Sequence, residues 1–221
     1  MSTSKMKWNK YDFFILIIIL IPIGLLVTFY NKLPNELATH FGISGEPNGY
    51  QGKITFLLFN IFLLIGVPLL MKVTRYIDPQ KRNYDKFEPT YDIFRLIFST
   101  FLSVMMITLL FYNLGHSVNI QMIILICIGI LFMFLGNYMS RIRFNFTIGI
   151  RTPWTLANEE VWRRTHRLGG PLWLTGGLLV VILAFLPGNI AFVYMMIVLA
   201  IITIIPMVYS YFLFKKLDHQ Q

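Results

Sequence analysis

Long apolar runs separated by short polar segments dominate the chain. Six runs are long enough, or nearly so, to cross a hydrocarbon core of about 30 Å as helices. The fifth run is short and rich in glycine, so its limits are the hardest to place. The pattern predicts an all-α integral membrane protein with six transmembrane helices. These cover residues 11–30, 54–71, 93–113, 121–139, 172–187 and 190–214.

The runs suggest a division into two membrane domains. Residues 11–71 form an N-terminal two-span domain with an outer loop at 31–53. An inner loop, 72–92, connects it to a four-span domain at 93–214, whose long inner loop covers residues 140–171. The remaining connections are tight turns, so any function beyond residence in lipid is expected in the three long loops.

Composition supports lipid as the solvent of this protein. Of its 221 residues, 56% are hydrophobic and only 13% are charged, whereas a soluble domain carries about a quarter charged residues. The net charge of +9 could indicate a nucleic-acid partner. The positions of the charges decide against that interpretation.

Almost all basic residues fall on one side of the predicted topology. Of 19 lysines and arginines, only Lys32 and Lys53 lie on the opposite side. Arg95 lies just inside the third run and is expected to snorkel toward the basic side. Because basic loops stay in the cytoplasm, both termini are expected inside, and no direct contact with nucleic acid is expected. The other 16 residues of the basic side are Lys5, Lys7, Lys10, Lys72, Arg75, Lys81, Arg82, Lys86, Arg141, Arg143, Arg151, Arg163, Arg164, Arg167, Lys215 and Lys216.

Residues that usually carry transport or catalysis are missing from the sequence. All ten acidic residues fall outside the interiors of the apolar runs, which argues against a proton-driven pump. There is no GxSxG, HExxH or P-loop motif, so no enzymatic activity is expected. Glu36 and His40 could meet on a helical turn, but further ligands are lacking, so no metal or cofactor is expected.

The outer loop contains the sequence EPNGY, which is typical of a tight turn. Asn48 and Gly49 are able to take positive φ there. Two interpretations stay open: the loop caps the helix bundle at the interface, or it is a docking surface for an extracellular, amphipathic ligand. In the second case, the residues that face the ligand are Pro34, His40, Phe41, Gly45, Gly49 and Tyr50.

The inner loop at 149–170 combines helix signals with an unusual density of charge. Thr152 can cap a helix that begins at Pro153, and Asn158 is a competing cap. This predicts a short interfacial helix, anchored by Trp162 and ended by residues 169–171, between spans four and five. Two acids precede arginines by four residues, the favourable order for helical ion pairs: Glu159 with Arg163, and Glu160 with Arg164.

That helix does not account for the segment before it. Gly149 permits an unusual backbone angle or a close approach. Arg151 is a forked donor beside a rigid Pro–Trp pair, and Arg141 and Arg143 lie on the same side. Such a group could hold a lipid phosphate, or a carboxylate from a partner or from another loop.

Two long motifs resemble a known family. The stretch GNYMSRIRFNFTIGIRTPWTLANEEVWRRTHRLGG resembles the signature of the SdpI family, immunity proteins for the sporulation-delaying peptide toxin of bacilli. The stretch LPNELATHFGISGEPNGYQGK resembles the loop of the DUF1648-type membrane domain often fused ahead of it. The matching regions span most of residues 14–200. The family pattern usually has aspartate where Asn48 stands and proline where Phe144 stands.

The resemblance implies a six-span protein of the bacterial plasma membrane that protects its cell from a secreted peptide toxin. It further implies a receptor that holds a cytoplasmic winged-helix repressor at the membrane. The alternatives are a lipid-interacting envelope protein without a dedicated toxin, or a small transporter. The inner-loop residues expected to carry the function are Gly136, Asn137, Gly149, Arg151, Thr152, Pro153, Trp154, Trp162, Thr165, His166 and Arg167.

Overall fold

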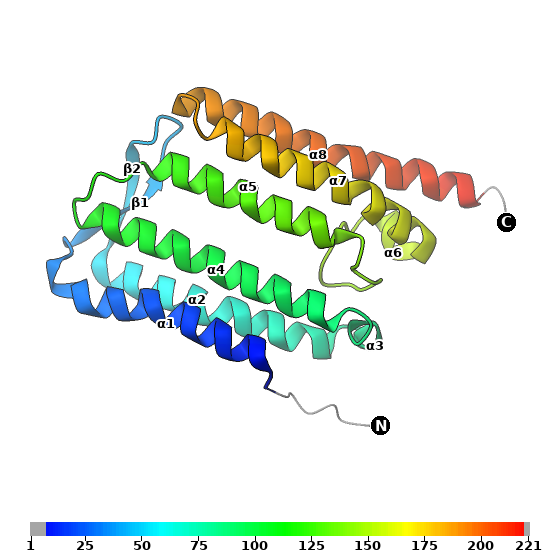
Figure 1. The fold of residues 1–221 in the computed structure, drawn as a ribbon, viewed down its shortest axis with the longest axis horizontal. Coiled ribbons are helices and arrows are strands. Elements are labelled where there is room, and N and C mark those ends of the chain that lie inside the picture. Colours follow the sequence, from blue (N-terminus) through cyan, green and yellow to red (C-terminus); the bar gives the residue numbers. More distant parts are fainter. Residues whose placement is uncertain (1–7, 219–221) are drawn as a thin grey trace.

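A computed structural model describes residues 8–218, which form a bundle of long helices with a small hairpin at one end (Figure 1). Six helices are long and apolar enough to cross a membrane, as the sequence predicts. These are α1 (Lys10–Phe29), α2 (Lys53–Ile77), α4 (Glu88–Asn113), α5 (Ile120–Met139), α7 (Glu159–Leu183) and α8 (Gly188–Asp218). The protein is therefore a multi-pass membrane protein.

The six helices form two groups of three. Helix α4 packs against α1 and α2, while α7 packs against α5 and α8. The contact between α4 and α5 joins the two groups (Figure 1). Helix α4 therefore groups with the two helices before it, although it follows the inner loop at 72–92.

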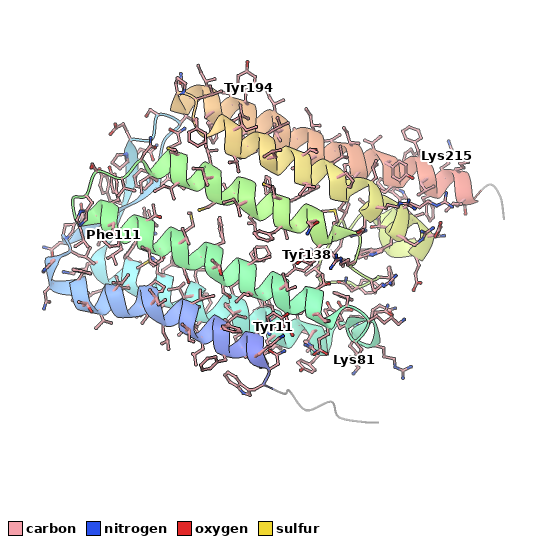
Figure 2. All side chains as sticks on the ribbon, viewed as in Figure 1. Tyr11, Lys81, Phe111, Tyr138, Tyr194 and Lys215 are labelled. Carbon is pink, nitrogen blue, oxygen red and sulfur yellow. The ribbon has the colours of Figure 1, made fainter. Side chains whose placement is uncertain are left out.

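Short elements cover both ends of the bundle. The hairpin end carries a 3-10 turn, Tyr30–Lys32, and the antiparallel strands β1 (Glu36–Phe41) and β2 (Pro47–Gly52). The opposite end, here called the termini end, carries α3 (Lys81–Tyr84) and α6 (Pro153–Ala157). Figure 2 shows Lys81 and Lys215 at the termini end and Phe111 at the hairpin end. Two of the basic residues assigned to the termini side, Lys5 and Lys7, lie outside the described residues.

The turn of the hairpin is not where the sequence placed it. Asn48 and Gly49 lie in β2 without positive φ, and Gly45 takes the left-handed conformation at φ +85°. The turn closes where Gly42 N donates to Glu46 O at 2.8 Å. The expectation that Glu36 and His40 could meet on a helical turn is also wrong, because both residues lie on strand β1. Strand pairing with β1 outweighs the local turn preference of EPNGY.

Helix α7 runs without a break through the predicted stop. Gly169, Gly170 and Pro171 lie inside it, so the short helix and span five are one element. The reason is tertiary packing. A Cβ atom on Gly169 would lie 2.8 Å from Met139 Sδ, and one on Gly170 would lie 3.0 Å from Gly136 O. Close approach to α5 therefore fixes the helix at residues whose intrinsic preference is to end it.

Candidate functional site

The corner between α5 and α7 is built from two successive helix caps. Thr152 Oγ1 accepts from Thr155 N at 3.1 Å, and Thr155 Oγ1 accepts from Thr152 N at 2.8 Å. This capping box opens α6 with Pro153 in its first turn, as predicted. Asn158 Oδ1 then accepts from Glu160 N at 2.8 Å and opens α7. Both predicted caps are therefore used, one for each helix.

The GIRTPW motif is held against the start of α7 by His166. The Nε2 atom of His166 accepts from Ile150 N at 3.0 Å, and its Nδ1 atom lies 2.8 Å from Trp162 O. This arrangement places the proton on Nδ1. Gly149 has φ +112°, and a Cβ atom there would overlap with His166 Nε2. Both properties predicted for Gly149, an unusual angle and a close approach, are confirmed.

Trp162 is not an interfacial anchor. Its side chain is 2% exposed and stacks on His166 at a centroid distance of 4.1 Å. The indole Nε1 donates to Ile142 O at 3.0 Å. The predicted anchor is wrong because the first turns of α7 pack against the protein. The hydrogen bond of Trp162 connects these turns to the loop that follows α5.

The two inner loops form one unit through the buried carboxylate of Asp78. Its Oδ2 atom accepts from Thr147 Oγ1 at 2.6 Å, Phe146 N at 3.0 Å and Tyr84 OH at 3.1 Å. Burial raises the pKa of the Tyr84 phenol, so that group stays protonated as a donor. Asp78 and Tyr84 come from the first inner loop and the other two groups from the second. One side chain therefore connects segments about 70 residues apart in the chain.

Asn145 and Asn83 extend this connection. Fully buried Asn145 accepts from Thr147 N and Ile148 N through Oδ1, both at 2.8 Å, which folds its own loop. Asn83 Nδ2 donates to Phe144 O at 2.9 Å, from one inner loop to the other. None of these groups is among the predicted site residues. Asx turns in the stretch RFNFT were a usable signal, but the partner carboxylate is invisible without the fold.

The predicted inner-loop residues divide into a buried set and an exposed set. Gly136 contacts α7 backbone, and a Cβ atom there would overlap with Leu174 N. The Thr165 hydroxyl is buried without a hydrogen-bond partner among the described residues. In contrast, Arg151 is exposed, and its NH1 donates to Phe146 O at 2.7 Å. The other predicted residues that reach the surface are Asn137, Pro153, Trp154 and Arg167.

The helical ion pairs differ in one partner from the prediction. Glu160 binds both Arg163, at 2.6 Å, and Arg164, at 2.5 Å. Glu159 has no ion-pair partner among residues 8–218. A single carboxylate therefore organises two arginines on the exposed face of α7.

A buried ion network joins α1, α2 and α4 at the termini end. Asp12 binds Lys72 Nζ at 2.7 Å and Arg95 NH2 at 2.7 Å. Arg95 NH1 also binds Asp92 at 3.0 Å. Arg95 is 3% exposed, so the expectation that it snorkels to the surface is wrong. Two carboxylates inside the protein bind the two terminal nitrogens of the guanidinium, while its buried Nε atom has no hydrogen-bond partner among the described residues.

The network continues toward the surface of the bundle. Arg75 NH2 binds Glu88 at 2.6 Å, and its NH1 lies 4.0 Å from Asp92. Asn9 Nδ2 donates to Asp92 Oδ2 at 2.6 Å. The acids lie near helix ends, as the sequence suggested, but two of them, Asp12 and Asp92, are buried there rather than solvated. The spacing of Lys72 and Arg75, three residues apart on α2, was the feature of the sequence that could have indicated this network.

The hairpin is fastened to both helix groups. Asn113 acts as a backbone substitute, because its Oδ1 accepts from Ala38 N at 2.8 Å and its Nδ2 donates to Ala38 O at 3.0 Å. Gln121 Nε2 donates to Ile43 O at 3.1 Å and also to Gly188 O. The hairpin turn is thereby connected to α5 and to the first residue of α8.

Beneath the hairpin lies a cavity of about 350 Å³ between α2 and α4. Apolar side chains such as Phe59 and Met105 line most of its wall, while His40 and Gln51 lie at the hairpin side and Asn60 is a polar group deeper in. Its shape and lining suit an apolar group attached to a polar chain.

Three of the six predicted outer residues are exposed, and the other three are partly buried. His40 and Tyr50 are exposed, as is Pro34. Phe41 packs edge-on against Tyr112 at 5.0 Å, so it holds the hairpin instead of facing a ligand. Gly45 approaches Gln121, where a Cβ atom would lie 3.2 Å from the amide oxygen. The last residue, Gly49, lies under His40.

The chain is similar to known proteins over most of its length. Residues 141–210 match the SdpI/YfhL protein family, and residues 17–65 match a domain of unknown function, DUF1648. The chain is 28% identical over 196 residues to "Immunity protein SdpI" of Bacillus subtilis (strain 168), covering 87% of this chain and 90% of that protein. The resemblance to the SdpI family is confirmed. No solved structure matches the chain significantly.

The SdpI-family region covers the second inner loop and the helices that follow it. It begins just after α5, contains the capped corner and α7, and ends within α8. The DUF1648 region contains most of α1, the hairpin and the first half of α2. Asp78, which connects the two inner loops, lies in neither region.

Proposed function

We propose that this protein is an immunity protein of the bacterial plasma membrane that protects its cell against a secreted peptide toxin. The proposal rests on the similarity to Immunity protein SdpI, which extends over 87% of this chain and includes both loops. The excess of basic residues at the termini end supports a cytoplasmic location for that end. The hairpin would then face the outside, where a secreted peptide arrives.

The peptide is proposed to bind at the hairpin and the cavity beneath it. Exposed Tyr50 and His40 offer a polar and aromatic rim, and the cavity accepts apolar side chains of the peptide. An amphipathic peptide that inserts into membranes has both kinds of surface. Capture at this site would remove the toxin from the lipid that it would otherwise disturb.

Toxin binding is further proposed to reach the cytoplasm as a signal. Gln121 joins the hairpin turn to α5 and α8, so a displaced hairpin would act on the helix group that carries the inner corner. There, exposed Arg151 and Arg167 and half-buried Trp154 would present the response to a cytoplasmic winged-helix repressor. This part rests on the family resemblance and on the exposure of the two arginines.

Peptide binding to the full-length protein in nanodiscs tests the proposal. Labelled sporulation-delaying peptide is titrated against the intact protein and against Leu102→Trp, which fills the cavity. Val104→Trp, on the lipid-facing side of the same helix, is the matched control. We expect saturable binding that Leu102→Trp abolishes and Val104→Trp preserves. Binding that is non-saturable, or equal in all three proteins, would contradict the proposed site.

A further inference from the structure

A second candidate binding site lies at the termini end, far from the hairpin. A groove of about 560 Å³ runs between α7 and α8, lined by Arg163, Arg164, Arg167, Leu168 and Tyr209. We propose that this groove binds the headgroup phosphate of an anionic phospholipid. The proposal is independent of any toxin.

The charge of the groove is positive and partly unused. Three arginines line the groove, and Glu160 binds two of them, Arg163 and Arg164. Arg164 uses only its Nε atom for this pair, which leaves both terminal nitrogens for another acceptor. Arg167 has no ion-pair partner among residues 8–218. Forked guanidinium donors are well suited to phosphate oxygens.

The groove also borders the apolar surface of the bundle. On α8, Ile205, Val208 and Phe212 follow one another at helical spacing, flank Tyr209 and are 43%, 47% and 63% exposed. In the membrane this stripe contacts acyl chains. Tyrosine is favoured at the boundary between headgroups and hydrocarbon. A headgroup in the groove would therefore have its chains already on an apolar face.

This border argues for a lipid rather than a soluble anion. Inorganic phosphate would use the arginines but gain nothing from the apolar stripe or Leu168. Exposed Lys215 and Lys216 continue the basic surface one turn beyond Phe212, where they would add to the attraction of an anionic leaflet. Basic grooves between membrane helices are a recurrent form of headgroup site.

Lipid selectivity of the intact full-length protein tests the proposal. The protein is reconstituted in phosphatidylcholine vesicles with a small fraction of spin-labelled phosphatidylglycerol, and the association constant relative to labelled phosphatidylcholine is measured. The test variant combines Arg163→Gln, Arg164→Gln and Arg167→Gln. The control combines Lys81→Gln, Arg82→Gln and Lys86→Gln, which removes the same charge from exposed positions at the same end.

We expect the intact protein to prefer phosphatidylglycerol. The relative association constant should fall about tenfold in the test variant and stay unchanged in the control. Inorganic phosphate added at constant ionic strength should not displace the lipid. Equal losses in both variants would reduce the effect to general surface potential and overturn the site. So would displacement by inorganic phosphate, or no preference in the intact protein. If the triple variant fails to fold, Arg167→Gln alone, against Lys81→Gln, gives the same comparison.

Discussion

Gly149 lies directly on the imidazole of His166, so that no side chain fits between the backbone of the GIRTPW motif and Nε2. The same nitrogen accepts a hydrogen bond from the backbone N–H of Ile150. The motif is therefore first a folding device, which fixes the chain at the point where it turns from α5 into α7. Any role in signalling falls to the neighbouring side chains that remain exposed.

Replacement of Gly149 by alanine should destabilise this corner. Left-handed backbone strain and the overlap with His166 together predict a loss of about 3 kcal/mol. Gly115→Ala is the control, because Gly115 has φ +87° but nothing within 4 Å of its Cβ position. Thermal unfolding of the purified proteins in detergent measures both. Equal losses of stability in the two variants would show that the contact with His166 does not contribute to the effect of Gly149→Ala.

Removal of the central carboxylate of the ion network should be costly. Asp12→Asn leaves Lys72 and Arg95 buried without their shared partner, and we expect a loss of about 3–5 kcal/mol. Asp218→Asn, at an exposed position, should change stability by less than about 0.5 kcal/mol. Denaturant unfolding of both variants checks this. A neutral Asp12→Asn would mean that water reaches the network.

The connection between the inner loops can be broken without touching a membrane helix. Asp78→Asn removes the charge and leaves one acceptor oxygen for donors that now use two, Gln80 N on Oδ1 and three groups of Tyr84, Phe146 and Thr147 on Oδ2. Amide hydrogen exchange in residues 144–150 should therefore rise by about tenfold or more. The control is Asp85→Asn, an exposed carboxylate in the same loop. Unchanged exchange in Asp78→Asn would show that the second loop folds without the first.

Close packing of α5 on α7 depends on glycine at single positions. In Gly136→Ala the new methyl group would overlap with the backbone of α7, and we expect a loss of about 1–3 kcal/mol. In Gly24→Ala nothing lies within 4 Å, so alanine should stabilise α1 slightly through its higher helix propensity. We therefore predict that the melting temperature falls in Gly136→Ala and rises slightly in Gly24→Ala. A stabilised Gly136→Ala would contradict the packing.

The sequence predicts this fold where a feature is local, and fails where a feature depends on a distant partner. The length of the apolar runs predicts the six spans, and the caps at Thr152 and Asn158 are read from their side chains alone. Continuity of α7 through Pro171 could not be read, because contact with α5 decides it. The burial of Arg95 was missed for the same reason, since its partner Asp12 lies 83 residues away.

The candidate site was predicted in location more than in role. Gly149 and His166 were both identified from the motif, but packing against each other explains them without a ligand. Asp78 escaped because a lone aspartate in a charged loop usually faces solvent. The cavity under the hairpin combines two helices and two strands, so no local pattern of residues indicates it.

Survival of toxin-sensitive cells tests the central claim most directly. This chain is expressed in bacilli that lack their own immunity protein, which are then exposed to purified sporulation-delaying peptide. The account predicts full protection by the intact protein and by Val104→Trp, and loss of protection by Leu102→Trp at equal membrane abundance. An intact, well-inserted protein that gives no protection would contradict the assignment to this toxin.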